Sequence, residues 1–522
     1  MDKSRPKILL IFLYIIFSLI LGKLFYIQVI SGQELHEQAL SQIYKIVKIF
    51  PRQGKILSRD KYPLSLGYSY YSLALYKPNF KNDLDEILTE ITSIKSDFAT
   101  QNAQLIDKFK NPNQKWLQFK GEFNTAEKNK LSKTSGLEFE LKQRRYYPEG
   151  DLAKDLVLNL EKKYLKQISG QVGFKRNVVD GTGIGLLTRK NWQKNEIDGQ
   201  DLHTTIDRKI QKLAEDTLKI GLATYQAESA SLIILEPQSG EILAMATVEA
   251  SPSANFTIKN IGHLFEPGSI FKPLVIASAL DSNSINQNWN CPNCNQPRKI
   301  GEYTINNWDK QVHPDTNLFD TIKNSDNISM SYINSAMGLN KFLEYYQRLK
   351  LNQKTGVELV GESISPLKDY WSDIDFATAS FGQGIAVNQL QMVQAFNTLA
   401  NDGKLVKAHI NQNTPIQSSS VFSTKTTDFV KKLLIYGVNN SPVSKLKDDD
   451  MIVCAKSGTA QVAVEGEYQE DNTIGSYIGF YPCNQPKFTM IVTLNNPKAS
   501  QWGSSTAAPL WFSLARDLDS LL

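Results

Sequence analysis

Three short stretches of the chain carry side chains that together could transfer an acyl group. The stretch EPGSIFKP places Ser269 and Lys272 three positions apart, so that both would lie on one face of a helix. A serine beside a lysine suits a nucleophile and its base, provided that burial or a neighbouring cation lowers the lysine pKa well below about 10.4. The stretch SDN supplies Ser325 and Asn327, and the stretch KSGT begins with a second lysine, Lys456. These residue types predict covalent catalysis by a serine.

Two prolines and a glycine surround Ser269 and constrain its backbone. Pro273 is tolerated only in the first turn of a helix, where its missing N–H costs nothing, and the run VIASALD after it is helical in character. We therefore expect a helix to begin close to Ser269, with free N–H groups that favour negative charge there. Serine and lysine at this spacing also suit an ordinary helix cap, so the other two stretches are needed to support a catalytic role.

The order of the three stretches carries a family resemblance. S-x-x-K, S-D-N and K-T-G together are typical of penicillin-binding proteins and serine β-lactamases, and here a serine replaces the threonine of the third. The chain resembles a class B penicillin-binding protein, a monofunctional peptidoglycan D,D-transpeptidase. TTID, EPQSGEILAMA and SYIGFYPCNQPKF also match, and SFGQGIAV resembles the division-associated branch. The resemblance is looser over residues 31–199, where PRQGKILSRDKYPLS departs from the pattern R-G-x-I-x-D-R-x-G at Gln53 and Tyr62.

The resemblance implies a role for each polar residue of the first two stretches. Ser269 would attack the carbonyl of the penultimate D-alanine of a stem peptide, and Lys272 would take the serine proton. Ser325 would pass a proton to the leaving amine. Asn327 would hold Lys272 and the substrate amide. Lys456 would lower the pKa of the neighbouring lysine and attract the substrate carboxylate.

The stretch that begins at Lys456 is expected to bind the substrate. By the same resemblance, the hydroxyls of Ser457 and Thr459 would hold the carboxylate, and Gly458 would let the substrate backbone lie flat against the strand. The backbone N–H groups of Ser269 and Thr459 would form the oxyanion hole. No cofactor is expected. The five histidines are scattered without a partner at metal-ligand spacing, so no metal site is expected either.

An apolar run near the N-terminus predicts the compartment. Residues 8–30 are apolar apart from a few positions such as Lys23, and as a helix they would extend roughly 34 Å, enough to span a bilayer. Basic residues within 1–7 favour a cytoplasmic N-terminus. The alternative is a cleaved signal peptide, but no small-x-small cleavage site follows the run. We expect a single-pass membrane protein whose catalytic domain is extracytoplasmic.

The remaining chain predicts an α+β protein. We expect a mixed α/β pedestal at 31–199, with one helical segment at KNDLDEILTEITSIKSDF, and a transpeptidase domain at 200–522. In the latter, a helix opens at Asp207, SASLIILEPQSGEILAMATV reads as a hairpin, and MIVCAKSGTAQV, SYIGFYP and FTMIVTLN read as strands. The segment TAAPLWFSLARDLDSLL reads as a helix. This pattern favours an antiparallel sheet flanked by helices, as in penicillin-binding proteins and serine β-lactamases.

Four cysteines allow two disulfides in an exported protein. Cys291 and Cys294 form a C-x-x-C motif that suits either a local disulfide or two free thiols. Cys454 and Cys483 flank two predicted strands and would come opposite each other in an antiparallel hairpin. We expect a bond between them, provided that their Cα atoms lie within about 7 Å.

The net charge of +5 and the absence of a basic, aromatic cluster argue against a nucleic-acid partner. The resemblance implies other partners: stem peptides of lipid II-derived glycan as substrates, β-lactams as inhibitors, and a polytopic membrane glycosyltransferase with division proteins. Asp326 reads as a loop residue with local hydrogen bonds. The stretch Gly382-Gln383-Gly384 reads as a loop that shapes the site.

Two other functions fit the same motifs. A D,D-carboxypeptidase or β-lactamase would use the same serine, and Glu358 and Glu362 follow SDN at a distance that suits a deacylating glutamate. A non-catalytic scaffold of a wall-building complex is the second. A sensor would need a signalling domain across the membrane, where we expect only about seven residues.

Overall fold

A computed structural model describes residues 5–77, 83–111, 113–134, 136–179, 185–186, 191–251, 258–464 and 467–522. The chain divides into two compact units. One comprises residues 1–54 and 166–200, and the other comprises residues 55–165 and 201–522. The expected boundary at residue 200 is one of three points where the chain passes between the units. The division into a pedestal and a transpeptidase domain stays a prediction.

The first unit contains the apolar helix and a small antiparallel sheet. The segment Lys7–Ile30 is long and apolar enough to cross a membrane, and no other described part of the chain buries it. The last five residues of this segment, Tyr26–Ile30, form a single π-helical turn. Strand β6 lies at the centre of the sheet and pairs with β1, β7 and β8. The elements are α1 (Arg5–Phe25), α2 (Gly32–Ile43), β1 (Tyr44–Ile49), α7 (Leu165–Ser169), β6 (Gly173–Val179), β7 (Gly185–Leu186) and β8 (Trp192–Lys194).

Residues 55–165 form a lobe of the second unit. Strand β3 pairs with β4, β5 and β2, and β2 continues the sheet to β9 in parallel. The predicted helical segment forms α3 and the start of α4, whose apolar side chains pack on the sheet around Phe98 and Phe123. The elements are β2 (Ile56–Leu57), β3 (Pro63–Tyr76), α3 (Leu84–Ile94), α4 (Phe98–Lys110), β4 (Trp116–Gln118), α5 (Thr125–Leu131), β5 (Leu137–Tyr146), α6 (Lys154–Lys163) and β9 (Leu202–His203).

Ion pairs join this lobe to the catalytic part of the same unit. The Arg208 guanidinium lies 2.6 Å from the Glu149 carboxylate and 3.3 Å from the Asp60 carboxylate, and 4.0 Å from the centre of the Tyr62 ring. The Asn159 amide exchanges two hydrogen bonds with the backbone of Val360. These contacts explain why residues 55–165 cluster with the catalytic part.

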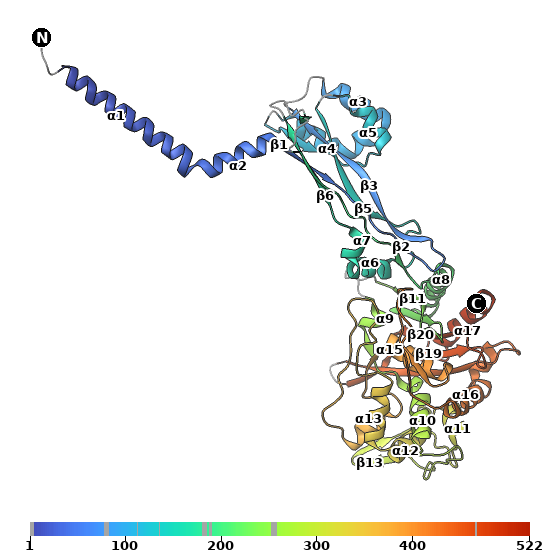
Figure 1. Cartoon of the computed structure of the whole chain (residues 1–522). Coiled ribbons are helices and arrows are strands. Elements are labelled where there is room, and N and C mark those ends of the chain that lie inside the picture. Colours follow the sequence, from blue (N-terminus) through green and yellow to red (C-terminus); the bar gives the residue numbers. More distant parts are fainter. Residues whose placement is uncertain are drawn as a thin grey trace. The chain divides into compact units, whose positions relative to one another are not determined.

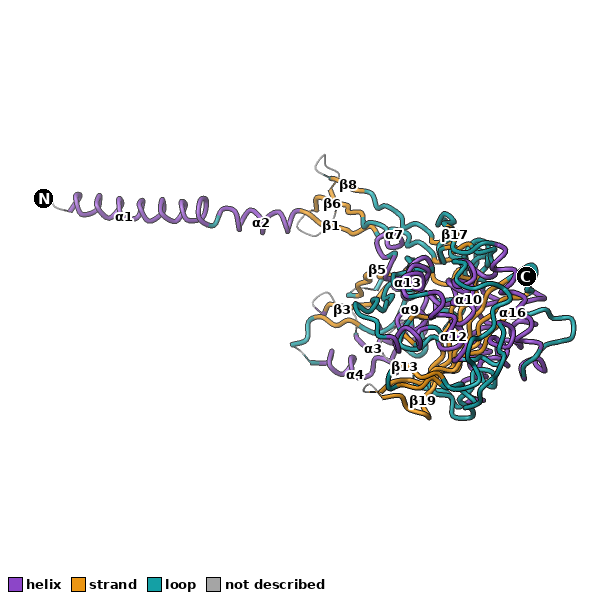
Figure 2. The backbone as a smooth tube through the Cα atoms, turned by 90° about the horizontal axis from the view of Figure 1, so that it is seen from below, coloured by secondary structure: helices purple, strands orange, loops and turns teal. Residues whose placement is uncertain are grey.

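The catalytic part is built on a five-stranded antiparallel sheet, as predicted. The strand order is β11-β10-β20-β19-β18. Asp207 caps α8 by accepting hydrogen bonds from two backbone N–H groups. In Figure 1, α8 and α17 lie on one side of the sheet and α10 to α13 on the other, and Figure 2 separates the strands from these helices by colour. The strands are β10 (Ser229–Leu235), β11 (Ile242–Glu249), β12 (Leu264–Phe265), β13 (Arg298–Ile300), β14 (Tyr303–Ile305), β15 (Val387–Asn388), β16 (Lys404–Val406), β17 (Ser418–Ser420), β18 (Cys454–Val464), β19 (Glu467–Tyr481) and β20 (Phe488–Asn495).

Period-two alternation along the strands separates the two faces of this sheet. Leu232 and Ile234 of β10 join the core beneath α8 and α17, where Trp511 is fully buried. The helices are α8 (Arg208–Tyr225), α9 (Lys259–Gly262), α10 (Lys272–Asp281), α11 (Leu318–Lys323), α12 (Asn327–Met337), α13 (Leu339–Arg348), α14 (Asp373–Ala379), α15 (Gln389–Ala400), α16 (Thr424–Asn439) and α17 (Ala507–Leu521), with 3-10 turns η3 (Gly268–Phe271) and η4 (Pro442–Leu446).

Both cysteine pairs form disulfides. Cys454 and Cys483 are joined with Cα atoms 5.2 Å apart, which confirms the pairing predicted from the hairpin. Cys291 and Cys294 are also joined, so the structure selects the disulfide over two free thiols. The first bond ties the start of β18, two residues before Lys456, to the chain after β19.

The Cys454–Cys483 disulfide closes the longer loop and should stabilise the catalytic part more than the Cys291–Cys294 disulfide does. Closing the loop between Cys454 and Cys483, 29 positions apart, corresponds to about 3–4 kcal/mol, whereas the loop of the Cys291–Cys294 pair corresponds to about 2 kcal/mol. We expect C454A/C483A to lower the urea midpoint of unfolding more than C291A/C294A does. Equal losses in the two double variants would contradict this ranking.

Candidate active site

Ser269 lies in the turn η3, directly before α10. The expected helix is present, but its first turn is 3-10 in form and the α-helix itself begins at Lys272. Gly268 has a φ of +57°, a backbone conformation that glycine adopts without strain. Its N–H donates to the carbonyl of Gly382 at 3.0 Å. The glycine of EPGS is therefore required by the turn that presents the serine.

Ser325 and Asn327 flank the start of α12. Ser325 has a φ of +53°, which non-glycine residues seldom adopt and which recurs at functional sites. Asp326 between them is fully buried. Its carboxylate caps α12 by accepting from the N–H of Ser329 at 2.7 Å, and its own N–H donates to the carbonyl of Thr321. These bonds hold the backbone of Ser325 in its strained form.

The third stretch lies on β18, which pairs with β19 alone in the sheet and forms its edge. Gly458 faces η3: a Cβ atom built there would lie 2.9 Å from the Ile270 side chain and 3.2 Å from the Pro267 carbonyl oxygen. The neighbouring Thr459 accepts a hydrogen bond at Oγ1 from the N–H of Gly503. Ser457 lies between Lys456 and Gly458 on the strand, and its carbonyl accepts from Lys456 Nζ at 2.9 Å. Close packing of β18 against η3 therefore depends on Gly458.

The hydroxyl of Ser325 connects the three stretches. Its Oγ lies 2.9 Å from Ser269 Oγ, 3.1 Å from Lys272 Nζ and 3.1 Å from Lys456 Nζ. Lys272 Nζ also donates to the carbonyl of Ser325 at 2.5 Å and to Oδ1 of Asn327 at 2.8 Å. All five residues predicted to act in catalysis are thus joined by hydrogen bonds, and Ser269 is linked to Lys272 through Ser325.

Comparison with known proteins agrees with this geometry. A family model described as the penicillin binding protein transpeptidase domain matches residues 230–516, more than half of the chain. The chain belongs to the penicillin-binding protein transpeptidase family. It is a class B member of that family.

Relatives extend the likeness over nearly the whole penicillin-binding protein. The probable peptidoglycan D,D-transpeptidase PenA of Neisseria gonorrhoeae is 25% identical, over 97% of this chain and 91% of the relative. The peptidoglycan D,D-transpeptidase FtsI of Escherichia coli K12 is 25% identical, over 95% and 88%. The crystal structure of penicillin binding protein 2X from Streptococcus thermophilus matches 91% of this chain and 80% of its own, with a TM-score of 0.75 and 21% identity. The similarity of fold to this structure therefore extends beyond the catalytic part of the chain.

The two lysines of this penicillin-binding protein have lowered pKa values. Burial lowers the pKa of Lys456 to about 8. The pKa of Lys272 lies well below its ordinary value, chiefly because the side chain is completely buried and secondly because of the Lys456 cation, while Asp326 acts in the opposite direction. Since a lysine accepts a proton only when neutral, this environment favours Lys272 as a base.

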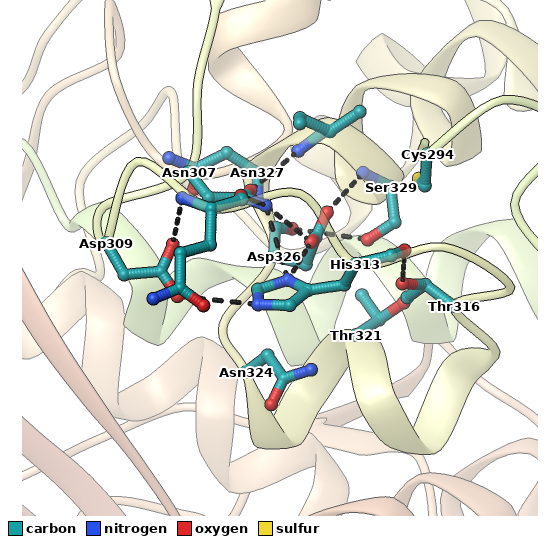
Figure 3. A network of polar contacts seen from close by, with 12 residues as sticks. Cys294, Asn307, Asp309, His313, Thr316, Thr321, Asn324, Asp326, Asn327 and Ser329 are labelled. Atoms are coloured by element: carbon teal, nitrogen blue, oxygen red, sulfur yellow. Dashed lines mark hydrogen bonds and ion pairs between the residues drawn. The ribbon is translucent and has the colours of Figure 1, made fainter. Parts of the chain in front are cut away.

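Two residues of the site were missed by reasoning from the sequence. Asn307 and His313 lie in the loop between β14 and α11, and both contact the Asp326 carboxylate at 2.7 Å (Figure 3). Asp326 was expected to be a loop residue with local hydrogen bonds. Its contacts with Ser329 and Thr321 are local, but those with Asn307 and His313 span 19 and 13 positions. Such contacts between loops leave no periodic pattern in the sequence from which they could be predicted. The one local feature that could have drawn attention to His313 is the proline that follows it in HPD.

Proposed function

We propose that this chain is a peptidoglycan D,D-transpeptidase that crosslinks stem peptides through an acyl-enzyme on Ser269. The observation that carries the proposal is the set of contacts at Ser325 Oγ, which reaches the oxygen of Ser269 and the amines of Lys272 and Lys456. A hydroxyl in this position passes a proton from a nucleophile to a base without a change in heavy-atom positions.

Acylation follows from this arrangement. Ser269 Oγ attacks the carbonyl carbon of the penultimate D-alanine, and its proton passes through Ser325 Oγ to neutral Lys272. As the amide bond breaks, the proton returns through Ser325 to the leaving nitrogen of the terminal D-alanine. An acceptor amine then attacks the ester and forms the new amide, and Ser269 regains its proton. The backbone N–H groups of Ser269 and Thr459 bind the developing oxyanion.

The substrate would bind along β18. An edge strand offers N–H and C=O groups to an extended peptide, and Gly458 lets this edge lie close to the turn η3 that carries Ser269. The Lys456 cation attracts the terminal carboxylate, and the hydroxyls of Ser457 and Thr459 bind it. A β-lactam has the same carboxylate and a reactive amide, so it acylates Ser269 in the same way and inhibits the enzyme.

We also propose where the enzyme works. The N-terminal residues 1–7 lie in the cytoplasm, the helix α1 anchors the chain in the membrane, and the catalytic part faces the wall outside. Nascent, lipid II-derived glycan then supplies the stem peptides. A polytopic membrane glycosyltransferase and division proteins are the expected partners, which is supported by the likeness to FtsI and by the SFGQGIAV stretch.

The two glutamates that could have served a hydrolase, Glu358 and Glu362, both have other hydrogen-bond partners. The Glu358 carboxylate accepts hydrogen bonds from Ile410 N–H and the Thr414 hydroxyl. The Glu362 carboxylate accepts from both the N–H and the hydroxyl of Thr355, at 2.7 Å each. Because both carboxylates already accept hydrogen bonds from loop residues, the observations favour an acyl-enzyme that waits for an amine over one that water rapidly hydrolyses.

A fluorescent penicillin tests the proposal. We expect the full chain in detergent to acquire label that survives denaturing electrophoresis, and S269A to acquire none, because the ester needs the serine oxygen. Rapid loss of label together with turnover of a chromogenic cephalosporin would identify a hydrolase. Absence of label in the folded wild type would favour the scaffold reading.

A further inference from the structure

The fully buried Asp326 carboxylate has no part in the mechanism above, yet it contacts three polar groups. Asn307 Nδ2 and His313 Nδ1 each lie 2.7 Å from Oδ2, and the N–H of Ser329 lies 2.7 Å from Oδ1 (Figure 3). The hydroxyl of Ser329 also donates to the Asp326 carbonyl. A buried carboxylate is costly unless it is hydrogen-bonded and paired with a cation.

His313 lies between two carboxylates. Its Nδ1 faces Asp326, and its Nε2 lies 3.4 Å from the carboxylate of Asp309. A carboxylate only accepts hydrogen bonds, and an imidazole can donate from both nitrogens only as the imidazolium. Each nitrogen of the His313 ring therefore faces a carboxylate oxygen.

The network reaches the catalytic lysine through two amides. Asn307 donates to Asp326 through Nδ2 and accepts from the N–H of Asn327 through Oδ1, at 2.8 Å. The Asn327 side chain in turn accepts from Lys272 Nζ at 2.8 Å and donates to the Asn306 carbonyl. Hydrogen bonds thus connect His313 to Lys272 by way of Asn327, whose backbone N–H contacts Asn307 and whose side chain contacts the lysine.

We propose that His313 and Asp326 act as positioning residues for Lys272. Through Asn307 the pair holds the backbone of Asn327, whose side chain contacts the lysine, and His313 offsets the negative charge that Asp326 presents to Lys272. This inference rests on the proposed function, because Lys272 matters as a base only if Ser269 is acylated.

Charged groups face this network from several elements. Lys272 comes from α10, Lys456 from β18 and Asp326 from the residue before α12, while Asp309 and His313 come from the loop after β14. The Asp326 carboxylate favours the charged form of Lys272 and thereby opposes the effects of burial and of Lys456. An imidazolium on Asp326 reduces this opposition and keeps the lysine available as a base.

Two isosteric variants separate the charge effect from a merely structural one. In H313N an amide still donates to Asp326 but the cation is lost, so Lys272 should hold its proton more strongly. In D326N an amide oxygen still caps α12 but the anion is lost, so Lys272 should release its proton more easily. We expect the acidic limb of the acylation rate against pH to move up by about 1 pH unit in H313N and down by about 1 pH unit in D326N. The double variant should return close to the wild type.

The measurement is the second-order rate of labelling by a fluorescent penicillin between about pH 5 and 9, on the full chain in detergent. H203N is a matched control on β9, away from the network, and should keep the wild-type limb. If H313N does not fold, the D326N limb decides by itself. Limbs displaced in the same direction, or a loss of rate without displacement, would overturn the inference. Failure of the wild type to label would instead count against the proposed function.

Discussion

Replacing Lys272 with methionine should slow the acylation of Ser269 by about 10²- to 10⁴-fold, the usual contribution of a general base. The lysine is fully buried, so an unbranched apolar side chain of similar length fills the same space. Methionine cannot accept the proton that Ser325 passes on. The measurement is the second-order rate of penicillin labelling at neutral pH.

A matched control separates lost chemistry from lost stability. K404M makes the same exchange at an exposed position of β16 in the same unit, and it should label at the wild-type rate. K272M also removes the donor to the Ser325 carbonyl and to Asn327 Oδ1, which costs about 1–3 kcal/mol of stability. Labelling of folded K272M within a few-fold of the wild-type rate would refute Lys272 as the base.

The second large effect is expected at Gly382, which does not belong to any of the three motifs. Its φ is +80°, and a Cβ atom there would lie 2.3 Å from the carbonyl oxygen and 2.6 Å from the nitrogen of Gly268. Those backbone atoms cannot move without displacing Ser269, the next residue. We expect G382A to reduce acylation at least about 100-fold, because a displacement of about 1 Å in the reacting geometry has an effect of this size.

Gly384 provides the matched control for this prediction. It also has a positive φ, +74°, but its Cβ atom would find only the ends of the Thr378 and Lys368 side chains, at 3.5 and 3.6 Å. Both variants incur the strain of a left-handed backbone, about 1–2 kcal/mol. Only the added methyl group of G382A would clash with the turn that carries Ser269. Equal acylation rates in the two variants would show that the clash with Gly268 does not affect acylation.

The sequence predicted the parts of the site that depend on local spacing. Ser269 and Lys272 are one turn apart, and Pro273 limits where their helix can begin, so their proximity follows from neighbouring residues. The Cys454–Cys483 bond follows from strand periodicity in the same way, because opposite positions of a hairpin come together. The expected strands around Lys456 are also present as β18 to β20.

Features that depend on distant contacts could not be predicted in this way. The strained backbone of Ser325 is held by Thr321 and by the helix cap of Asp326, and nothing in the letters SDN specifies a φ of +53°. His313 contacts Asp326 because of the path that its loop takes, and the residues of that loop show no periodic pattern of hydrophobicity. The association of residues 55–165 with the catalytic part rests on pairs such as Arg208 with Glu149, which only the folded chain brings together.

The order of strands in the catalytic sheet has a consequence for how the enzyme is made. Strand β10 pairs with β20, and the hydroxyls of Ser231 and Thr493 meet although they lie 262 positions apart. Pairing over such a separation carries a large loop-closure cost and is slow. A ribosome therefore completes Ser269 and Ser325 well before it makes the strands that join β18 to the rest of the sheet. We therefore expect a chain that ends before β20 to contain Ser269 without the complete sheet that places β18 beside it, and to remain unlabelled by penicillin.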